Sequence, residues 1–131
     1  MLALTSPVIW YTSRATGIVA LVLLSTTVAL GLRTAGRRRT PRWPGFATAE
    51  LHKRLSVITL VFLGLHILTG VADTFVHLGW PSIIVPFAST YKPFWTGLGT
   101  VAFDLLVAVA ISSALRQRIP PHIWRGLHWL A

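Results

Sequence analysis

Long apolar stretches, separated by shorter polar segments, divide the chain into four parts. Residues 15–32 and 55–72 form two such runs, the first without a charged residue and the second interrupted by His66. A third run covers residues 95–115 and contains one acid, Asp104. Because a hydrocarbon core about 30 Å thick requires roughly 20 apolar residues in a helix, each of these runs predicts a transmembrane helix.

A fourth apolar run begins near His122 and stops after ten residues, at residue 131. Ten residues of helix rise about 15 Å, so this run either lies in the membrane interface or belongs to a truncated helix, and we expect truncation. The predicted architecture is an all-α integral membrane bundle in one domain, residues 1–131, with three full transmembrane helices and the start of a fourth. The expected helices cover residues 8–33, 48–78, 95–116 and 122–131.

The composition excludes several classes of site. Of the 131 residues, 53% are hydrophobic and 11% are charged, whereas soluble domains carry about 25% charged residues. The chain has no cysteine, so a disulfide framework, a thiolate metal site and a thiol nucleophile are excluded, as is the usual ligation of an Fe–S cluster.

The 12 basic side chains are placed unevenly along the chain. Ten of them lie in residues 33–54 or after residue 115, whereas Arg14 and Lys92 belong to the opposite side. Basic residues concentrate in cytoplasmic loops, so we expect the N-terminus and residues 80–95 outside a bacterial plasma membrane and the 33–54 connection inside. Anionic lipid headgroups explain the basic cluster better than nucleic acid, for which the chain has no motif.

Two histidines of the second run, His52 and His66, lie 14 positions apart. On a helix this spacing is close to four turns and about 21 Å, so both imidazoles fall on one face. Histidine is a standard axial ligand of haem iron, and this pair suits two stacked cofactor sites. Under the expected topology, His128 enters the membrane at a depth similar to that of His52. A packed, hydrogen-bonded role for each histidine remains the alternative.

Three other polar residues have expected positions. His77 falls near the same helical face as His52, but beyond the hydrocarbon core. Asp73, near the outer end of the second helix, is expected to be solvated. Asp104 is expected to be paired, protonated or facing water, because a charged carboxylate is costly within a bilayer.

The chain resembles the ferric-reductase-like transmembrane domain family in two segments. These are LHKRLSVITLVFLGLH, which contains His52 and His66, and WRGLHWL, which contains His128. In that family, two helices each carry a pair of histidines, and the four histidines ligate two b-type haems stacked across the bilayer. The resemblance implies haem b in one complete site, His52 with His128, and a second site half-complete at His66, whose expected partner would lie past residue 131.

The resemblance also makes four basic residues candidates for contacts with haem propionates, although anchoring at the interface explains them as well. These residues are Arg14, Lys53, Arg54 and Arg125.

The function implied by the resemblance is transmembrane electron transfer, as in membrane oxidoreductase components, without a nucleophile or general base from the protein. Electrons would come from a cytoplasmic-side flavoprotein or quinol and pass to an acceptor outside. Two alternatives stay open: a membrane anchor or assembly subunit without haem, and a quinone-linked cytochrome b561-type protein. The pattern also allows an oligomer.

Overall fold

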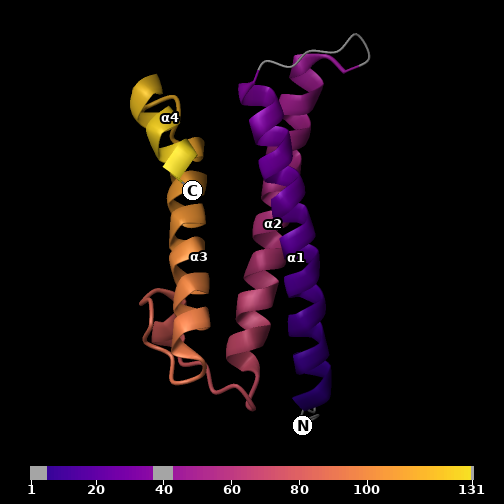
Figure 1. Cartoon of the computed structure of the whole chain (residues 1–131), viewed down its shortest axis with the longest axis vertical. Coiled ribbons are helices and arrows are strands. Elements are labelled where there is room, and N and C mark those ends of the chain that lie inside the picture. Colours follow the sequence, from indigo (N-terminus) through magenta and orange to yellow (C-terminus); the bar gives the residue numbers. More distant parts are fainter. Residues whose placement is uncertain (1–5, 37–42, 131) are drawn as a thin grey trace. The chain divides into compact units, whose positions relative to one another are not determined.

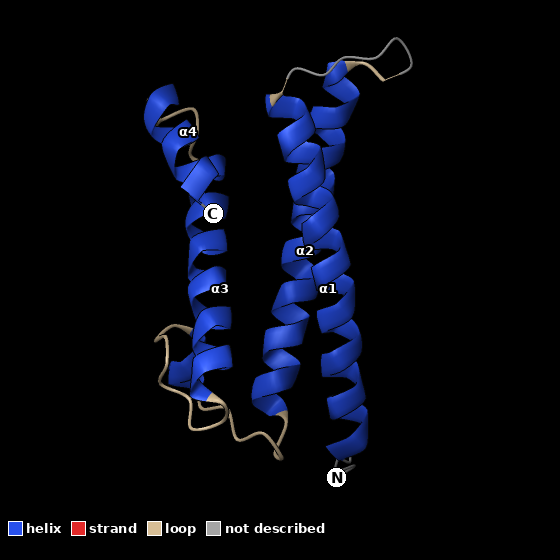
Figure 2. Cartoon of the chain, in the orientation of Figure 1, coloured by secondary structure: helices blue, strands red, loops and turns tan. Residues whose placement is uncertain are grey.

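The computed structural model describes residues 6–36 and 43–130 of the chain. Helices account for all regular structure in this described part (Figures 1 and 2). In chain order they are α1 (Ser6–Ala35), α2 (Gly45–Ala72), the short 3₁₀ helix η1 (Trp80–Ile83), α3 (Pro93–Ala114) and α4 (Pro121–Leu130). The chain divides into two compact units, Met1–Phe75 and Val76–Ala131.

Three helices, α1, α2 and α3, are long and apolar enough to cross a membrane. Large apolar side chains on them face outwards; Ile18 is 65% exposed and Phe46 is 78% exposed. Such a surface is stable in lipid, where backbone polar groups must be satisfied within each helix. The chain is therefore an integral membrane protein, and the predicted all-α class, with three spanning helices and a short fourth helix, is confirmed.

In the first unit, α1 and α2 run antiparallel and pack against each other along their length (Figure 1). The α1 positions that face α2 recur every seven residues, at Ser13, Ala20 and Thr27. Ala20 and Thr27 are buried, and so is Thr59, which lies on α2 halfway between His52 and His66. Small residues let helix backbones approach closely in a membrane, and a seven-residue repeat keeps one face of each helix on its partner.

The hydroxyls of Thr27 and Thr59 meet in this interface at 3.3 Å. We expect Thr27→Val and Thr59→Val to be coupled in a double-mutant cycle by about 0.6 kcal/mol, which is typical of interhelical hydrogen bonds in membranes. The measurement is unfolding of the purified chain in detergent. Thr26→Val is the matched control, because the exposed Thr26 hydroxyl donates only to the carbonyl of Val22 in its own helix. Additive effects at Thr27 and Thr59 would contradict the prediction.

The end of α2 differs from the sequence prediction. The helix ends at Ala72 instead of residue 78, and Asp73 follows in extended backbone, with φ −72° and ψ 115°. Its Oδ1 accepts a hydrogen bond of 2.9 Å from the amide of Phe75, a local turn that competes with continuation of the helix. Asp73 is only 3% exposed, so the expectation of a solvated carboxylate was wrong.

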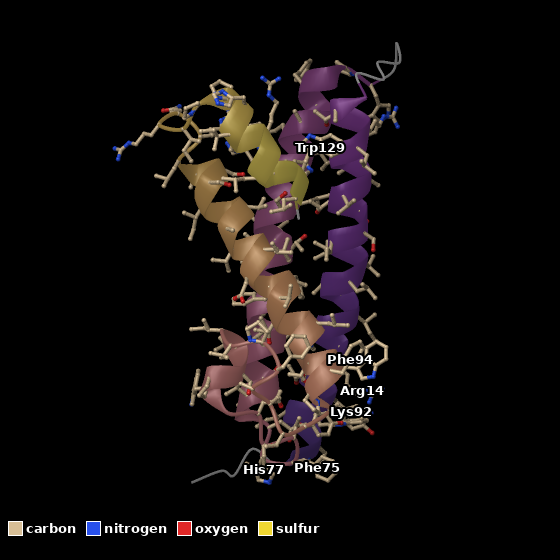
Figure 3. All side chains as sticks on the ribbon, turned by 60° about the vertical axis from the view of Figure 1, so that its left-hand side comes forward. Arg14, Phe75, His77, Lys92, Phe94 and Trp129 are labelled. Carbon is tan, nitrogen blue, oxygen red and sulfur yellow. The ribbon has the colours of Figure 1, made fainter. Side chains whose placement is uncertain are left out.

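The early end of α2 also moves His77 off the helical face on which the sequence placed it. His77 is exposed and has a φ of 47°, in the connection that follows α2 (Figure 3). It therefore does not continue the face formed by His52 and His66.

In the second unit, a side-chain hydrogen bond links α4 to α3. The Trp124 indole donates a hydrogen bond to the Ser113 hydroxyl at 3.4 Å. The helix starts at Pro121, where proline is favoured because the first turn needs no amide donor. The carbonyl of Pro120 accepts the amides of Ile123 and Trp124 at 3.0 and 3.1 Å.

Candidate functional site

The imidazole of His66 is held against α1 by a hydrogen bond. Its Nδ1 lies 2.8 Å from the carbonyl oxygen of Ser13. A carbonyl can only accept, so the ring carries its hydrogen on Nδ1, and the lone pair of the neutral ring is on Nε2. The side chain is half-buried.

The same arrangement occurs at His52, one level further along the helix pair. The Nδ1 of His52 donates to the carbonyl oxygen of Thr27 at 2.9 Å. The Thr27 carbonyl also belongs to the backbone ladder of α1, and its two lone pairs allow it to accept both bonds.

A glycine lies four residues after each of these carbonyls. A Cβ added at Gly17 would lie 2.8 Å from Cε1 and Nδ1 of His66, and one added at Gly31 would lie 3.1 Å from Cε1 of His52. In a helix the Cα–Cβ bond tilts toward the N-terminus, so a side chain at these positions would cover the turn that carries the carbonyl. Glycine keeps both carbonyls accessible to the rings.

The surroundings of His66 and of His52 are built from residues at the same spacing along α1 and α2. Ser13 and Thr27 lie 14 residues apart, as do Gly17 and Gly31, and this spacing equals that between His66 and His52. Fourteen residues of helix rise about 21 Å. Because 14 residues make two seven-residue repeats, the antiparallel pair presents the same surroundings to both histidines.

This geometry is the one expected of metal-ligating histidines. Such a histidine usually donates its other ring N–H to a carbonyl or carboxylate, which fixes the ring orientation and raises the basicity of the ligating nitrogen. Among residues 6–36 and 43–130, no three His, Asp or Glu side chains come close enough to hold a metal ion by themselves. A metal inside a macrocycle needs only one or two axial ligands from the protein, so single histidines at two levels fit haem.

The third predicted ligand, His128, lies in the second unit, on α4. Its half-buried ring stacks on the indole of Trp124, with centroids 5.0 Å apart and an interplanar angle of 28°. The pairing of His128 with His52 stays a prediction.

Arg14, a candidate contact for a propionate, directly follows Ser13, whose carbonyl accepts the hydrogen bond from His66. Its guanidinium lies 4.6 Å from the ring centroid of Trp10, one helical turn away, and the side chain is exposed on α1 (Figure 3). This cation–π contact holds a positive charge close to the level of His66.

The other three basic candidates are also exposed. Arg54 forms an exposed ion pair of 2.8 Å with Glu50 on the same helix. Lys53 lies directly after His52 in the sequence. On α4, the Nε of Arg125 donates to the carbonyl of Pro121 at 3.2 Å. Asp104 is half-buried near the middle of α3.

The sequence pattern indicates the two histidines of α2 but not the residues of α1 that orient them. The available signal was the 14-residue spacing of Gly17 and Gly31, which repeats the spacing of the histidines. Gly64 on α2 has open space beside it: an added Cβ would meet nothing within 4 Å.

Comparison with known proteins identifies the family. The sequence model of the family described as ferric reductase like transmembrane component matches residues 16–131. No curated protein and no solved structure matches the chain. The matched region contains Gly17, Gly31 and the histidines of α2 and α4, and it extends over most of the chain. The protein therefore belongs to the ferric reductase-like transmembrane family, which confirms the resemblance seen in its sequence.

Proposed function

We propose that the protein carries electrons across the membrane through b-type haem held by its histidines. The observation that carries this proposal is the pair of matched hydrogen bonds, His66 to Ser13 and His52 to Thr27. Membership of a ferric reductase-like family supports it, because that family consists of membrane oxidoreductase components.

In this function, His52 and His128 are the proposed axial ligands of one haem, and His66 contributes one ligand to a second. Bound haem would supply reversible one-electron chemistry. The Thr27 and Ser13 carbonyls orient the imidazoles of His52 and His66 and keep the hydrogen on Nδ1, so the ligating atom would be the basic Nε2. The apolar side chains of the helices limit access of water, which tunes the potential of such a site.

The basic residues have a compatible role. We propose that Lys53, Arg54 and Arg125 balance propionate charge on the cytoplasmic side, and that Arg14 does so on the outer side. The donor would be a flavoprotein or quinol at the cytoplasmic face, and the acceptor would lie outside, in line with the uneven distribution of basic residues.

The test is a reduced-minus-oxidised visible spectrum of the detergent-purified chain, with haem quantified per polypeptide. We expect a sharp low-spin α-band, because bis-histidine iron is low-spin. We also expect about one haem per chain, because only the pair of His52 and His128 completes a site. His128→Ala should abolish the band. His122→Ala is the matched control, because His122 also lies on α4 but is exposed in its first turn.

Other outcomes of this measurement have definite meanings. About two haems per chain would mean that His66 also has a partner histidine, since each b-type haem takes two axial ligands here. Absence of haem would overturn the proposal in favour of a structural or assembly subunit. Reduction of the band by quinol would identify a quinone-linked protein.

A further inference from the structure

The connection before α3 has an unusual surface. Residues 79–91 contain no charged side chain and no histidine. Several of their large apolar side chains are exposed: Trp80 is 68%, Ile84 is 70% and Val85 is 52% exposed. Contiguous exposed apolar residues indicate a surface that meets another apolar phase or molecule.

This segment lies alongside α3 and does not project from its end (Figure 2). The Thr100 hydroxyl donates to the carbonyl of Ser82 at 2.7 Å, and both residues are buried. A Cβ added at Gly97 would lie 2.6 Å from Cε1 of Phe87, so glycine is needed for this ring to approach the helix. Two contacts on successive turns therefore fix the segment along the start of α3.

The position of these contacts along α3 places the segment within the depth of the bilayer. The 22 residues of α3 rise about 33 Å, so nearly the whole helix is required to cross a core of about 30 Å. Lys92, directly before α3 (Figure 3), marks the headgroup level, where its ammonium can reach water. Thr100 lies about 10 Å further along the helix axis than Pro93.

Local hydrogen bonds satisfy part of the polar backbone of the segment. The Ser82 amide donates to Gly79 at 2.9 Å, and the Val85 amide donates to Pro81 at 2.8 Å. The Tyr91 amide donates to the Ser89 hydroxyl at 3.1 Å, and the Tyr91 carbonyl accepts the Thr96 hydroxyl at 2.8 Å. Internal satisfaction of this kind is what a non-helical backbone needs where water is scarce.

We propose that residues 79–91 insert into the boundary between headgroups and acyl chains, in the leaflet on the Lys92 side of α3. Ile84 and Val85 contact the acyl chains, while Ser82 and Ser89 face the protein. Interfacial segments bury their apolar face about 5–10 Å into this boundary, which agrees with the level of Thr100. The depth of the contacts with α3 favours lipid over a soluble protein as the partner.

The absence of cysteine allows a direct test. Ile84→Cys is labelled with an environment-sensitive fluorophore, and the full chain is reconstituted in phosphatidylcholine vesicles. The lipids carry bromine either near the headgroup end or near the methyl end of the acyl chain. We expect a blue-shifted emission, strong quenching by shallow bromine, weaker quenching by deep bromine and protection from iodide.

Two further variants complete the experiment. Gln117→Cys, an exposed residue in the connection between α3 and α4, is the matched control and should be quenched by iodide only. Thr100→Val removes the donor to Ser82 and should reduce bromine quenching at the label on Ile84→Cys. Iodide quenching at position 84 equal to that of the control would overturn the proposal. Protection from both bromine and iodide would also overturn it, in favour of burial against protein.

Discussion

Replacing His52 with alanine is expected to abolish the low-spin haem spectrum of the purified protein. Bis-histidine ligation requires both axial nitrogens, and under the proposed function His52 and His128 are the two ligands of one haem iron. The helix pair should remain folded, because the Thr27 carbonyl keeps its place in the backbone ladder of α1 after the imidazole is removed. The measurement is the reduced-minus-oxidised spectrum, with haem content per chain and helicity by circular dichroism.

Two histidine variants are controls for this result. His66→Ala should leave the spectrum of the His52 site in place, since the two histidines lie about 21 Å apart along the helix. His77→Ala should have no effect, because His77 is exposed and lies outside α2. An unchanged spectrum in His52→Ala, or an equal loss in His77→Ala, would contradict the assignment of His52 as a ligand.

Adding one methyl group at Gly17 is expected to destabilise the helix pair and to turn the His66 ring. The Cβ would lie 2.8 Å from two ring atoms, well inside the contact distance of about 3.5–4.0 Å. The ring cannot withdraw without lengthening its hydrogen bond to Ser13. We expect a net loss of about 1–2 kcal/mol for Gly17→Ala, because overpacking costs about 1–3 kcal/mol and the gain from replacing a helical glycine is about 0.5–1 kcal/mol.

The corresponding change at Gly31 should have a smaller effect, since its Cβ would lie 3.1 Å from the nearest ring atom of His52. Gly64→Ala is the matched control on the same helix pair. An added Cβ there meets nothing within 4 Å, so this variant should be neutral or slightly more stable.

Two measurements check this ranking. Unfolding in detergent gives the order of stability, and nitrogen NMR of the histidine side chains reports whether Nδ1 of His66 still donates to a carbonyl. Equal stability of the three alanine variants, with an unchanged NMR signal from His66, would show that the space at Gly17 is not needed by the ring.

The membrane class, the approximate helices and the histidine face could be predicted because they depend on local properties of the chain. Uninterrupted apolar runs define the spanning helices, and the regular 3.6-residue turn of a helix puts His52 and His66 on one face without knowledge of their neighbours. The end of α2 could not be predicted in this way. There, the Asp73 carboxylate bonds the Phe75 amide, and this turn overrides an apolar pattern that continues through Val76 and Leu78.

The sequence by itself determined that this protein spans a membrane as helices and which histidines could serve as ligands. Only the tertiary structure decided how the histidines of α2 are oriented. That orientation depends on the antiparallel register between two helices, and hydropathy contains no information about register. In the folded pair, Ser13 and Thr27 offer carbonyls, and Gly17 and Gly31 leave room for the rings. A backbone carbonyl has no sequence signature, since every residue carries one, and its use as an acceptor depends on which side chain packs across from it.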